Sequence, residues 1–349
     1  MAAELTSYAA IRGAVNARAT LDAGYTTVRD CGAHEYENVA VAKAVRAGLI
    51  AGPRIMAAGP WLSISGRHEY ARWRPEISVR FPGRVDSPDD ARRVVREVVY
   101  HGADFIKLRA TGNVHTEGTD PSQAELTVAE MRAAVETAHD KGVRVASHAH
   151  GLAGVKNSLM AGVDTIEHGS FLDERAVEMF LERDAYLVPT LSFVKNMMAA
   201  SANAPKFALE KARAVRDAQM RSFQMALEAG VRIAAGSDAG MLHTHHGDNA
   251  DELHHLVEAG MSPSRALLAA TRFAAEAIGL DKEIGSIAVG QFADLVAVGK
   301  NPLSEIDSLS DHDNIRLIVR NGEVHYHAGQ LSGRVESGGR PSVRADHTT

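Results

Sequence analysis

Two spacings of apolar residues alternate along the chain. Apolar residues recur at helical spacing, and each such segment is followed by a short run rich in Val, Ile and Thr. The predicted helices lie at about 5–21, 38–47, 89–101, 127–141, 152–161, 174–183 and 206–229. Glycines such as Gly142 and Gly162 stand between several helix and strand pairs, where a left-handed residue ends a helix. The pattern therefore predicts repeated helix and strand units.

The predicted strands lie at 25–30, 54–58, 104–108, 143–148, 163–168, 186–189 and 231–235. Strands that alternate with helices form parallel sheets. No Gly-x-Gly-x-x-Gly loop follows any of these strands, which argues against a dinucleotide-binding sheet. Polar residues gather at the carboxyl ends of several strands, as they do in (β/α)8 barrels. We predict an α/β fold, a (β/α)8 TIM barrel that lacks its first strand.

The pattern changes after Gly279. Strand-like runs at 284–287, 290–298 and 315–320 are followed by the hairpin turn Asn321-Gly322 and a last strand at 323–325. These runs are too few to fold alone and predict the C-terminal strands of a composite β-sandwich. The predicted domains are a barrel at 1–283, sandwich strands at 284–328, and a disordered tail at 329–349 that is rich in Gly, Ser, Arg and His.

Composition narrows the functional classes. The chain has 349 residues, a net charge of −6 and no apolar run of about 18 residues, so neither nucleic acid nor a membrane is the expected partner. The single cysteine, Cys31, forms no internal disulfide, and residues 1–5 do not resemble a signal peptide, which favours a cytoplasmic protein. With 17 histidines, any metal would have nitrogen and oxygen ligands. We expect a small-molecule substrate; a homo-oligomer is compatible with the sequence.

The polar residues at predicted strand ends form a chemically coherent set. They are Asp30, Lys107, His148 with His150, His168 and Asp238. Imidazoles, a carboxylate and a lysine at a barrel mouth indicate a metal-dependent hydrolase. Burial would lower the pKa of Lys107, and a neutral amine can add carbon dioxide to form a carbamate that bridges two cations. Taken singly, a strand-end lysine is also an ion-pair partner, a strand-end histidine a structural residue, and Asp238 a helix cap.

Seven short motifs resemble the amidohydrolase superfamily, specifically its imidazolonepropionase-like and prolidase-like (Xaa-Pro, Xaa-Arg dipeptidase) branch. They lie at 26–30 (TTVRD), 51–55 (AGPRI), 103–107 (ADFIK), 147–151 (SHAHG), 161–169 (AGVDTIEHG), 236–240 (GSDAG) and 290–295 (GQFADL). The resemblance runs from about residue 10 to residue 328. It implies that Lys107 is the carbamylated bridging ligand and that His148 and His168 hold the second metal.

The resemblance also implies the remaining roles. Asp238 would bind the first metal and carry a proton from hydroxide to the leaving amine, and His150 would hydrogen-bond the developing oxyanion. The cofactor would be one or two divalent ions, most simply zinc. His246 would contact the substrate, and Arg67 and His68 would line the pocket beside a loop at 111–123. Arg67 pairs equally well with a substrate carboxylate or with a protein group.

One element of the superfamily pattern is missing, because no His-x-His motif precedes Tyr25. Either the natural protein continues upstream and has a complete binuclear site, or this chain lacks two ligands of the first metal. In the second case we expect at most one bound divalent metal, little activity, and low stability from apolar edges exposed at Thr27, Val28 and Ile233.

The sequence therefore predicts a metal-dependent amidohydrolase that cleaves an amide bond in a small substrate, a dipeptide or an N-acyl amino acid. Metal-activated hydroxide would attack the carbonyl, with Asp238 as the proton shuttle. Two alternatives remain at this stage: a truncated or degenerate barrel without catalysis, and a hydrolase of lactones or other esters.

Overall fold

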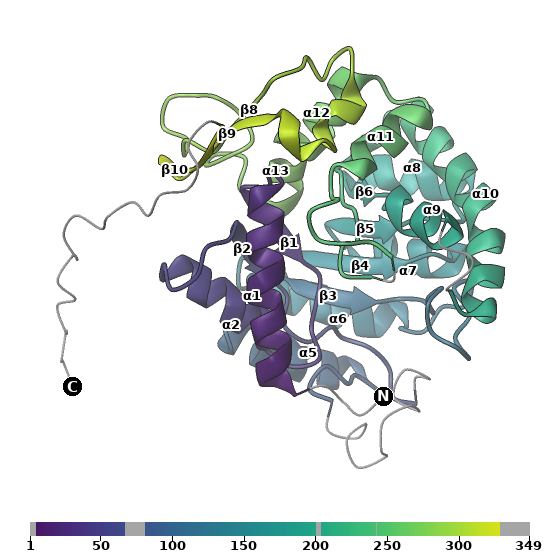
Figure 1. Cartoon of the computed structure of the whole chain (residues 1–349). Helices are drawn as coiled ribbons and strands as arrows, with labels where there is room; N and C mark the ends of the chain where they lie inside the picture. Colours follow the sequence, from purple (N-terminus) through teal and green to yellow (C-terminus); the bar gives the residue numbers. More distant parts are fainter. Residues whose placement is uncertain (1–4, 67–80, 200–203, 242, 329–349) are drawn as a thin grey trace, which may run out of the picture.

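A computed structural model describes residues 5–66, 81–199, 204–241 and 243–328 (Figure 1). Arg67, His68 and the tail at 329–349 lie outside these ranges. The first four strands and their helices follow the predicted order. These elements are α1 (Thr6–Asp22), β1 (Thr27–Asp30), α2 (Glu37–Arg46), β2 (Arg54–Ala57), α5 (Pro88–Tyr100), β3 (Ile106–Arg109), α6 (Val128–His139) and β4 (Val145–Ala149).

The second half continues the alternation and adds helices. It comprises α7 (Leu152–Ala161), β5 (Thr165–His168), α8 (Glu174–Arg183), β6 (Tyr186–Val188), α9 (Leu191–Ala199), α10 (Lys206–Ala229), β7 (Arg232–Ile233), α11 (Asp251–Glu258), α12 (Pro263–Ala270) and α13 (Arg272–Ile278). The helices α9, α11, α12 and α13 were not predicted from the pattern. Among the described residues, no helix combines the length and the apolar character needed to cross a bilayer.

The strands are parallel and follow one another in sequence order. β1 pairs with β2, and β3 to β7 form a five-stranded sheet in the order β3-β4-β5-β6-β7. Leu62, beyond β2, joins the two sheets, because its amide donates to the Lys107 carbonyl (2.7 Å) and its carbonyl accepts from the Arg109 amide (2.9 Å). In the described ranges no backbone hydrogen bond joins β7 to β1. The prediction of an α/β fold with sequential parallel strands is confirmed.

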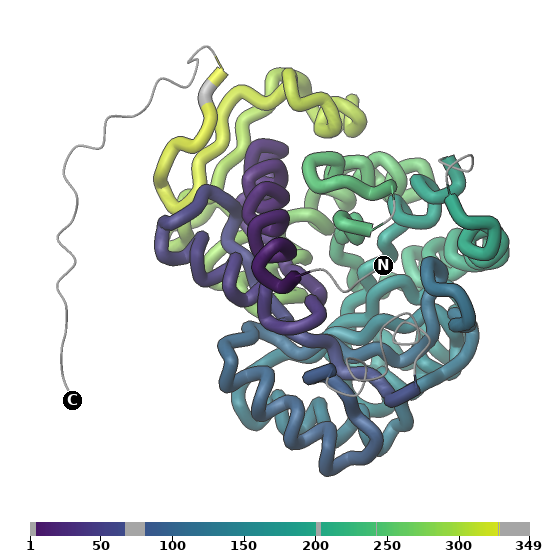
Figure 2. Tube along the Cα trace, turned by 60° about the horizontal axis from the view of Figure 1, so that its bottom comes forward, coloured from purple at the N-terminus to yellow at the C-terminus, as the bar shows by residue number. Residues whose placement is uncertain are grey.

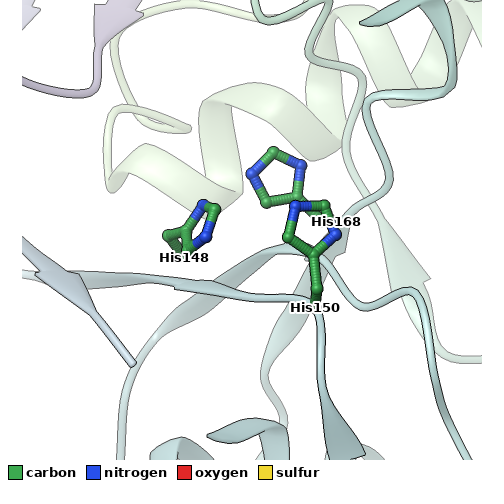
Figure 3. Close-up of side chains that lie close together, drawn as sticks. All are labelled: His148, His150 and His168. Atoms are coloured by element: carbon green, nitrogen blue, oxygen red, sulfur yellow. The ribbon is translucent and has the colours of Figure 1, made fainter. Parts of the chain in front are cut away.

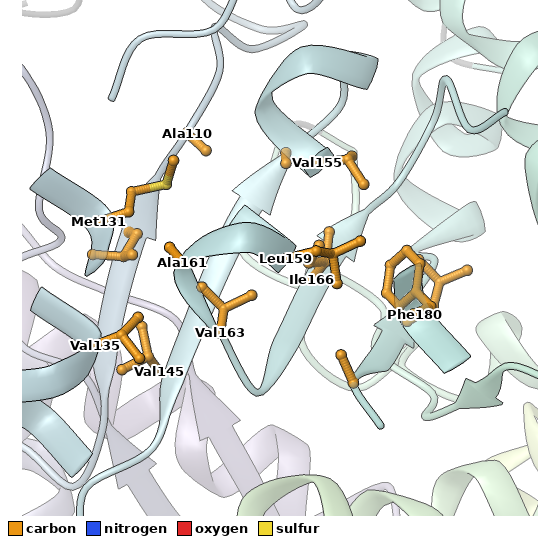
Figure 4. Packing of buried hydrophobic residues seen from close by; sticks show 14 of the residues in the cluster. Ala110, Met131, Val135, Val145, Val155, Leu159, Ala161, Val163, Ile166 and Phe180 are labelled. Atoms are coloured by element: carbon orange, nitrogen blue, oxygen red, sulfur yellow. The ribbon is translucent and has the colours of Figure 1, made fainter. Parts of the chain in front are cut away.

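The main core lies between the sheet and the helices that cover it (Figure 4). Ile106, Val145 and Ile166, one from each of β3, β4 and β5, are at most 1% exposed and pack with Leu159 and Met131 of the covering helices. Each such side chain contributes about 1.5–3 kcal/mol by leaving water. The core therefore fixes the relative positions of the three strands whose carboxyl ends carry the predicted site.

The ends of the helices show why the chain turns where it does. Thr127 and Glu130 form a reciprocal capping box at the start of α6. Gly162 ends α7 with a φ of 92°, a left-handed conformation that glycine adopts without a steric penalty. The following residues can then enter β5 directly. Local signals of this kind account for the agreement between the predicted and observed bounds of α7 and α8.

The C-terminal strands form a separate antiparallel sheet. Its strands β8 (Leu295–Val298), β9 (Ile315–Arg320) and β10 (Glu323–His327) have the order β10-β9-β8, and two short 3-10 helices, η1 (Ile306–Leu309) and η2 (His312–Asn314), lie between β8 and β9. Leu21 of α1 packs against Ile315 and Ile318. Arg54 makes an ion pair with Asp294 at 2.7 Å. Figure 2 shows this sheet beside the N-terminal helix α1.

Two expectations about these regions are wrong. Residues 284–287 do not form a strand: Gly285 has a φ of 92° and packs so closely against α13 that a Cβ there would lie 2.6 Å from the Ala275 side chain. The apolar face expected to be exposed at Ile233 is covered, since Ile233 is 1% exposed and belongs to the main core with Leu256. The helix α11 supplies part of that cover.

Candidate metal and active site

Three histidines meet at the carboxyl ends of β4 and β5 (Figure 3). His148 lies in β4, His150 follows that strand, and His168 ends β5. The His150 and His168 rings are stacked with centroids 4.3 Å apart, and the His148 ring lies 4.6 Å from that of His168. One nitrogen from each ring lies within 4.8 Å of the others. The spacing suits three ligands, or two ligands and a neighbouring hydrogen-bond donor.

Neighbouring groups fix the tautomers of two of these rings. The Gly112 carbonyl can only accept, so His148 Nε2, 3.0 Å away, donates and leaves the Nδ1 lone pair free. Thr190 donates its hydroxyl proton to the Pro189 carbonyl (2.7 Å), so it accepts from His168 Nδ1 (2.7 Å). His168 therefore presents the lone pair of Nε2. Such outer hydrogen bonds are how proteins orient histidine ligands.

The three imidazoles are neutral at physiological pH. Burial lowers the pKa of His148 and of His168 well below the usual value, and each is lowered further by neighbouring histidines and by Lys107. Burial lowers the pKa of His150 to about 3, with contributions from His115 and Lys107. Neutral rings keep the lone pairs that a metal requires.

Lys107 forms a buried charge network with two residues that the sequence reasoning did not select. Its ammonium is in contact with the Glu167 carboxylate, and Arg29 donates to the same carboxylate at 2.7 Å. Thr165 donates a further hydrogen bond to Glu167 at 2.8 Å. The two cations hold the pKa of Glu167 below its usual value, although burial opposes them. The ion-pair role considered for Lys107 is therefore present in this structure.

Asp238 follows β7 and has a φ of 57°. Burial raises the pKa of its carboxyl group to about 6, Lys107 opposes that rise and Glu167 adds to it. A carboxylate with a pKa near the working pH is suited to accept and return a proton. Cys31 directly follows β1, and burial raises the pKa of its thiol while Arg29 and Lys107 oppose that rise.

Strained backbone marks three successive strand ends. His168 (φ 77°), Thr190 (φ 53°) and Asp238 (φ 57°) follow or end β5, β6 and β7, and all three are non-glycine residues in the left-handed region. Each costs on the order of 1–3 kcal/mol, and such residues concentrate at functional sites. Two of these three residues, His168 and Asp238, are among the predicted site residues.

The remaining predicted residues lie elsewhere. His246 Nδ1 is 3.2 Å from the Thr20 hydroxyl of α1, and its ring packs close to Gly240. Asp30 accepts from the Gly32 amide and from Asn38, so it acts as a turn cap. Arg67 and His68 were named as pocket residues and lie outside the described ranges.

Sequence reasoning missed several residues that surround the cluster. They are Arg29, Gly112, Glu167, Ser170 and Thr190. Arg29 and Glu167 belong to motifs already quoted, and a charged residue inside an apolar strand next to Lys107 was a usable signal. Thr190 and Ser170 carried no comparable signal, because hydroxyl residues are common where strands end.

Neutral imidazoles, a lysine and a carboxylate of raised pKa at the carboxyl ends of parallel strands are the donor types that hydrolysis assisted by a metal uses. The chain matches the amidohydrolase family over residues 6–325 and belongs to it. It is therefore a hydrolase that acts on C–N bonds.

Particular relatives refine this assignment. The chain is 30% identical over 342 residues to the ochratoxinase of Aspergillus niger, covering 92% of this chain and 70% of that enzyme. A solved Xaa-Pro dipeptidase with methionine bound in its active site matches with a TM-score of 0.85 at 34% identity, over 90% of this chain and 79% of that one. A prolidase in complex with N-methylphosphonate-L-proline matches with a TM-score of 0.82 at 30% identity, over 92% and 80%. The resemblance to prolidase-like amidohydrolases is confirmed.

Proposed function

We propose that the protein is a metal-dependent hydrolase of an amide bond in a small substrate, a dipeptide or an N-acyl amino acid. The observation that carries the proposal is the meeting of His148, His150 and His168 at the carboxyl ends of β4 and β5. Lys107 lies close enough to lower the pKa of His168 and to oppose the rise in the pKa of Asp238. The donor set fits a divalent cation, because at least two rings present a free nitrogen and none of the three is protonated at neutral pH.

Nδ1 of His148 and Nε2 of His168 would hold the ion. Zinc is the simplest choice, since imidazole and carboxylate ligands suit it. When bound, a divalent cation lowers the pKa of water and polarises a carbonyl oxygen. Asp238 would complete the ligands and, with a pKa near 6, accept the proton of the attacking water and return it to the leaving amine.

The charges around Lys107 favour its carbamylation once metal is present. Arg29 and Glu167 balance each other, so the Lys107 ammonium is the excess positive charge next to the cation site. Loss of one proton from the ammonium gives the neutral amine. Addition of carbon dioxide to that amine forms an N–C bond and releases a second proton, so the positive charge at Lys107 becomes a negative one. Lys107 must leave Glu167 for this to occur, and Arg29 remains to pair with Glu167.

His150 would act on the substrate side. Its ring is stacked on His168, and its Nδ1 lies 2.8 Å from the Ser170 hydroxyl. That contact orients the ring so that the opposite nitrogen can hydrogen-bond the oxyanion that develops during attack. We retain His246, Arg67 and His68 as proposed substrate contacts.

The relatives favour an amino acid as the leaving group. One is a Xaa-Pro dipeptidase, and another binds N-methylphosphonate-L-proline, in which tetrahedral phosphorus replaces the carbonyl carbon next to the proline nitrogen. A compound with that geometry resembles the transition state of amide hydrolysis. We propose that this chain cleaves an amide formed with proline or with another amino acid.

Hydrolysis of Xaa-Pro dipeptides and N-acyl amino acids, with zinc and with a chelator, tests the proposal. Zinc-dependent release of the amino acid is expected, and Asp238→Asn should lower kcat/KM by at least about 10²-fold through loss of the proton acceptor. His245→Ala is the matched control, because His245 is exposed in the same loop. Unchanged turnover by Asp238→Asn contradicts the mechanism. Cleavage of lactones alone supports the esterase alternative, and zinc binding without any turnover supports a non-catalytic barrel.

A further inference from the structure

A second group of potential ligands lies away from the strand ends, on the helix α11. His254 and Glu258 are one helical turn apart, and His255 is three residues before Glu258, so all three side chains reach the same side of the helix. His254 Nε2 is 3.7 Å from Glu258 Oε2, and His255 Nδ1 is 3.6 Å from the same oxygen. Three ligand atoms, one per residue, lie within 4.8 Å of one another.

These separations match a tetrahedral ion. Bonds of about 2.1 Å place neighbouring ligands roughly 3.4 Å apart, so small side-chain shifts would bring the three atoms onto one zinc. Separations of 3.6 and 3.7 Å are too long for hydrogen bonds between these side chains. His255 Nδ1 is buried and has no hydrogen-bond partner among the described residues, which leaves a polar atom that a cation would satisfy.

Asp307 supplies the outer contact that histidine ligands commonly have. It belongs to η1, and its Oδ1 lies 2.5 Å from His254 Nδ1. A carboxylate accepts, so Nδ1 of His254 carries a proton, and Nε2 is the atom that faces Glu258. Burial lowers the pKa of His255 to about 4.

We propose that His254, His255 and Glu258 form a zinc site with Asp307 as its outer carboxylate, distinct from the histidine cluster at the strand ends. A cavity of about 580 Å³ opens beside it and leaves room for water at the fourth position. Because Asp307 lies in η1, the bound ion would tie α11 to the segment between β8 and β9. The role is structural, and it does not depend on the proposed hydrolysis.

One cation competes for the site. Lys195 of α9 contacts Glu258 Oε2, the oxygen that would bind the ion. The lysine side chain is 23% exposed, so its ammonium can move into water when zinc arrives. Competition of this kind predicts that removing the ammonium strengthens zinc binding, which a purely structural ion pair would not do.

Zinc stoichiometry and affinity, measured by competition with a chelator on the whole chain, test the site. His254→Ala and Glu258→Gln should each remove one zinc per chain and leave hydrolysis intact, whereas His148→Ala should not affect this ion. Asp307→Asn should weaken it by about 10–100-fold. Lys195→Gln should strengthen it by roughly fivefold or more, because a like charge has gone.

Asp311→Asn is the matched control, since Asp311 lines the same cavity without belonging to the ligand set. Unaltered zinc content in both His254→Ala and Glu258→Gln overturns the proposal, as does a Lys195→Gln affinity no higher than that of the wild type. Because Glu258 is half exposed, Glu258→Gln provides a readout even if His254→Ala does not fold. If His254→Ala or Glu258→Gln loses this zinc and still hydrolyses substrate, the second site is independent of the proposed catalytic site. A failure of the proposed hydrolysis would therefore not be mistaken for a failure of this zinc site.

Discussion

Thr190 shows how much of the site rests on residues that would not touch a metal. Its hydroxyl accepts from His168 Nδ1 and donates to the Pro189 carbonyl, and so determines which nitrogen of His168 is free. Gln219 of α10 donates to the same carbonyl at 2.6 Å. The orientation of His168, a proposed ligand, therefore depends on a chain of contacts that reaches the covering helices.

Thr190→Val should weaken zinc binding at the histidine cluster by about 10–100-fold, because His168 loses its acceptor while the β-branched shape is kept. The affinity is measured by chelator competition in the His254→Ala background, so that only the strand-end cluster is titrated. Thr190→Ser retains the hydroxyl and should bind zinc within about threefold of the wild type. Equal affinities for the valine and serine variants would show that Thr190 does not orient His168.

At this scale the sequence predicted the chemical types better than their pairings. Lys107, His148, His168 and Asp238 could be selected because the carboxyl ends of parallel strands meet at one end of the sheet. The pairing of Lys107 with Glu167 could not be predicted from the sequence. It depends on the register between β3, β4 and β5, which the sequence of any one strand does not specify.

At the scale of elements, α11 supports α9 through a buried carboxylate. Glu252 of α11 accepts from the Leu191 amide (2.9 Å), the Ser192 amide (2.7 Å) and the Ser192 hydroxyl (2.6 Å). These amides belong to the first turn of α9, where backbone donors lack partners and the helix dipole favours a negative charge. Burial nevertheless raises the pKa of Glu252 to about 7.

This raised pKa makes stability depend on pH. Between pH 4.5 and about 7 the folded chain keeps a proton at Glu252 that the unfolded chain releases, so the free energy of unfolding should fall as pH rises through this range. The fall attributable to Glu252 is about 3 kcal/mol. Glu252→Gln, which cannot ionise, should lack it. Urea unfolding of both metal-free proteins at pH 4.5 and pH 8 checks this, and identical pH dependence would contradict it.

The helices that the pattern did not predict share a physical cause. α9, α11, α12 and α13 have 9, 8, 8 and 7 residues, which is too short for a clear helical period in the sequence. A tertiary contact from Glu252 supports α9. The long helix α10 was predicted with the correct bounds, as were α7 and α8, which end at the left-handed residues Gly162 and Asp184.

At the scale of the whole molecule, the C-terminal sheet is attached to the start of the chain. Ile318 and Ile315 of β9 pack on Leu21 of α1, and Arg54 pairs with Asp294 ahead of β8. Leu21 and Ile318 are both fully buried. The C-terminal sheet thus lies against the helix α1 and contacts the start of β2. Its stability should therefore be coupled to the stability of these two elements.

Ile318→Ala should lower the free energy of unfolding by about 2–5 kcal/mol, because it leaves a cavity between β9 and α1. Chemical unfolding followed by circular dichroism measures the change, and a single transition is expected since the contact spans both ends of the chain. Val324→Ala is the control: Val324 is 59% exposed on the same sheet and should change stability by less than about 0.5 kcal/mol. A large loss in Val324→Ala, or none in Ile318→Ala, would contradict this coupling.

The Gly112 carbonyl has a consequence for engineering. It fixes the tautomer of His148, yet it lies in the segment 111–123 that we expect to border the substrate. Close packing restricts the same segment, since a Cβ at Gly112 would come within 2.2 Å of the Asp120 carbonyl oxygen. Libraries that randomise this loop to change specificity would therefore also select for altered metal affinity. Holding Gly112 and Asp120 constant would let the two properties evolve separately.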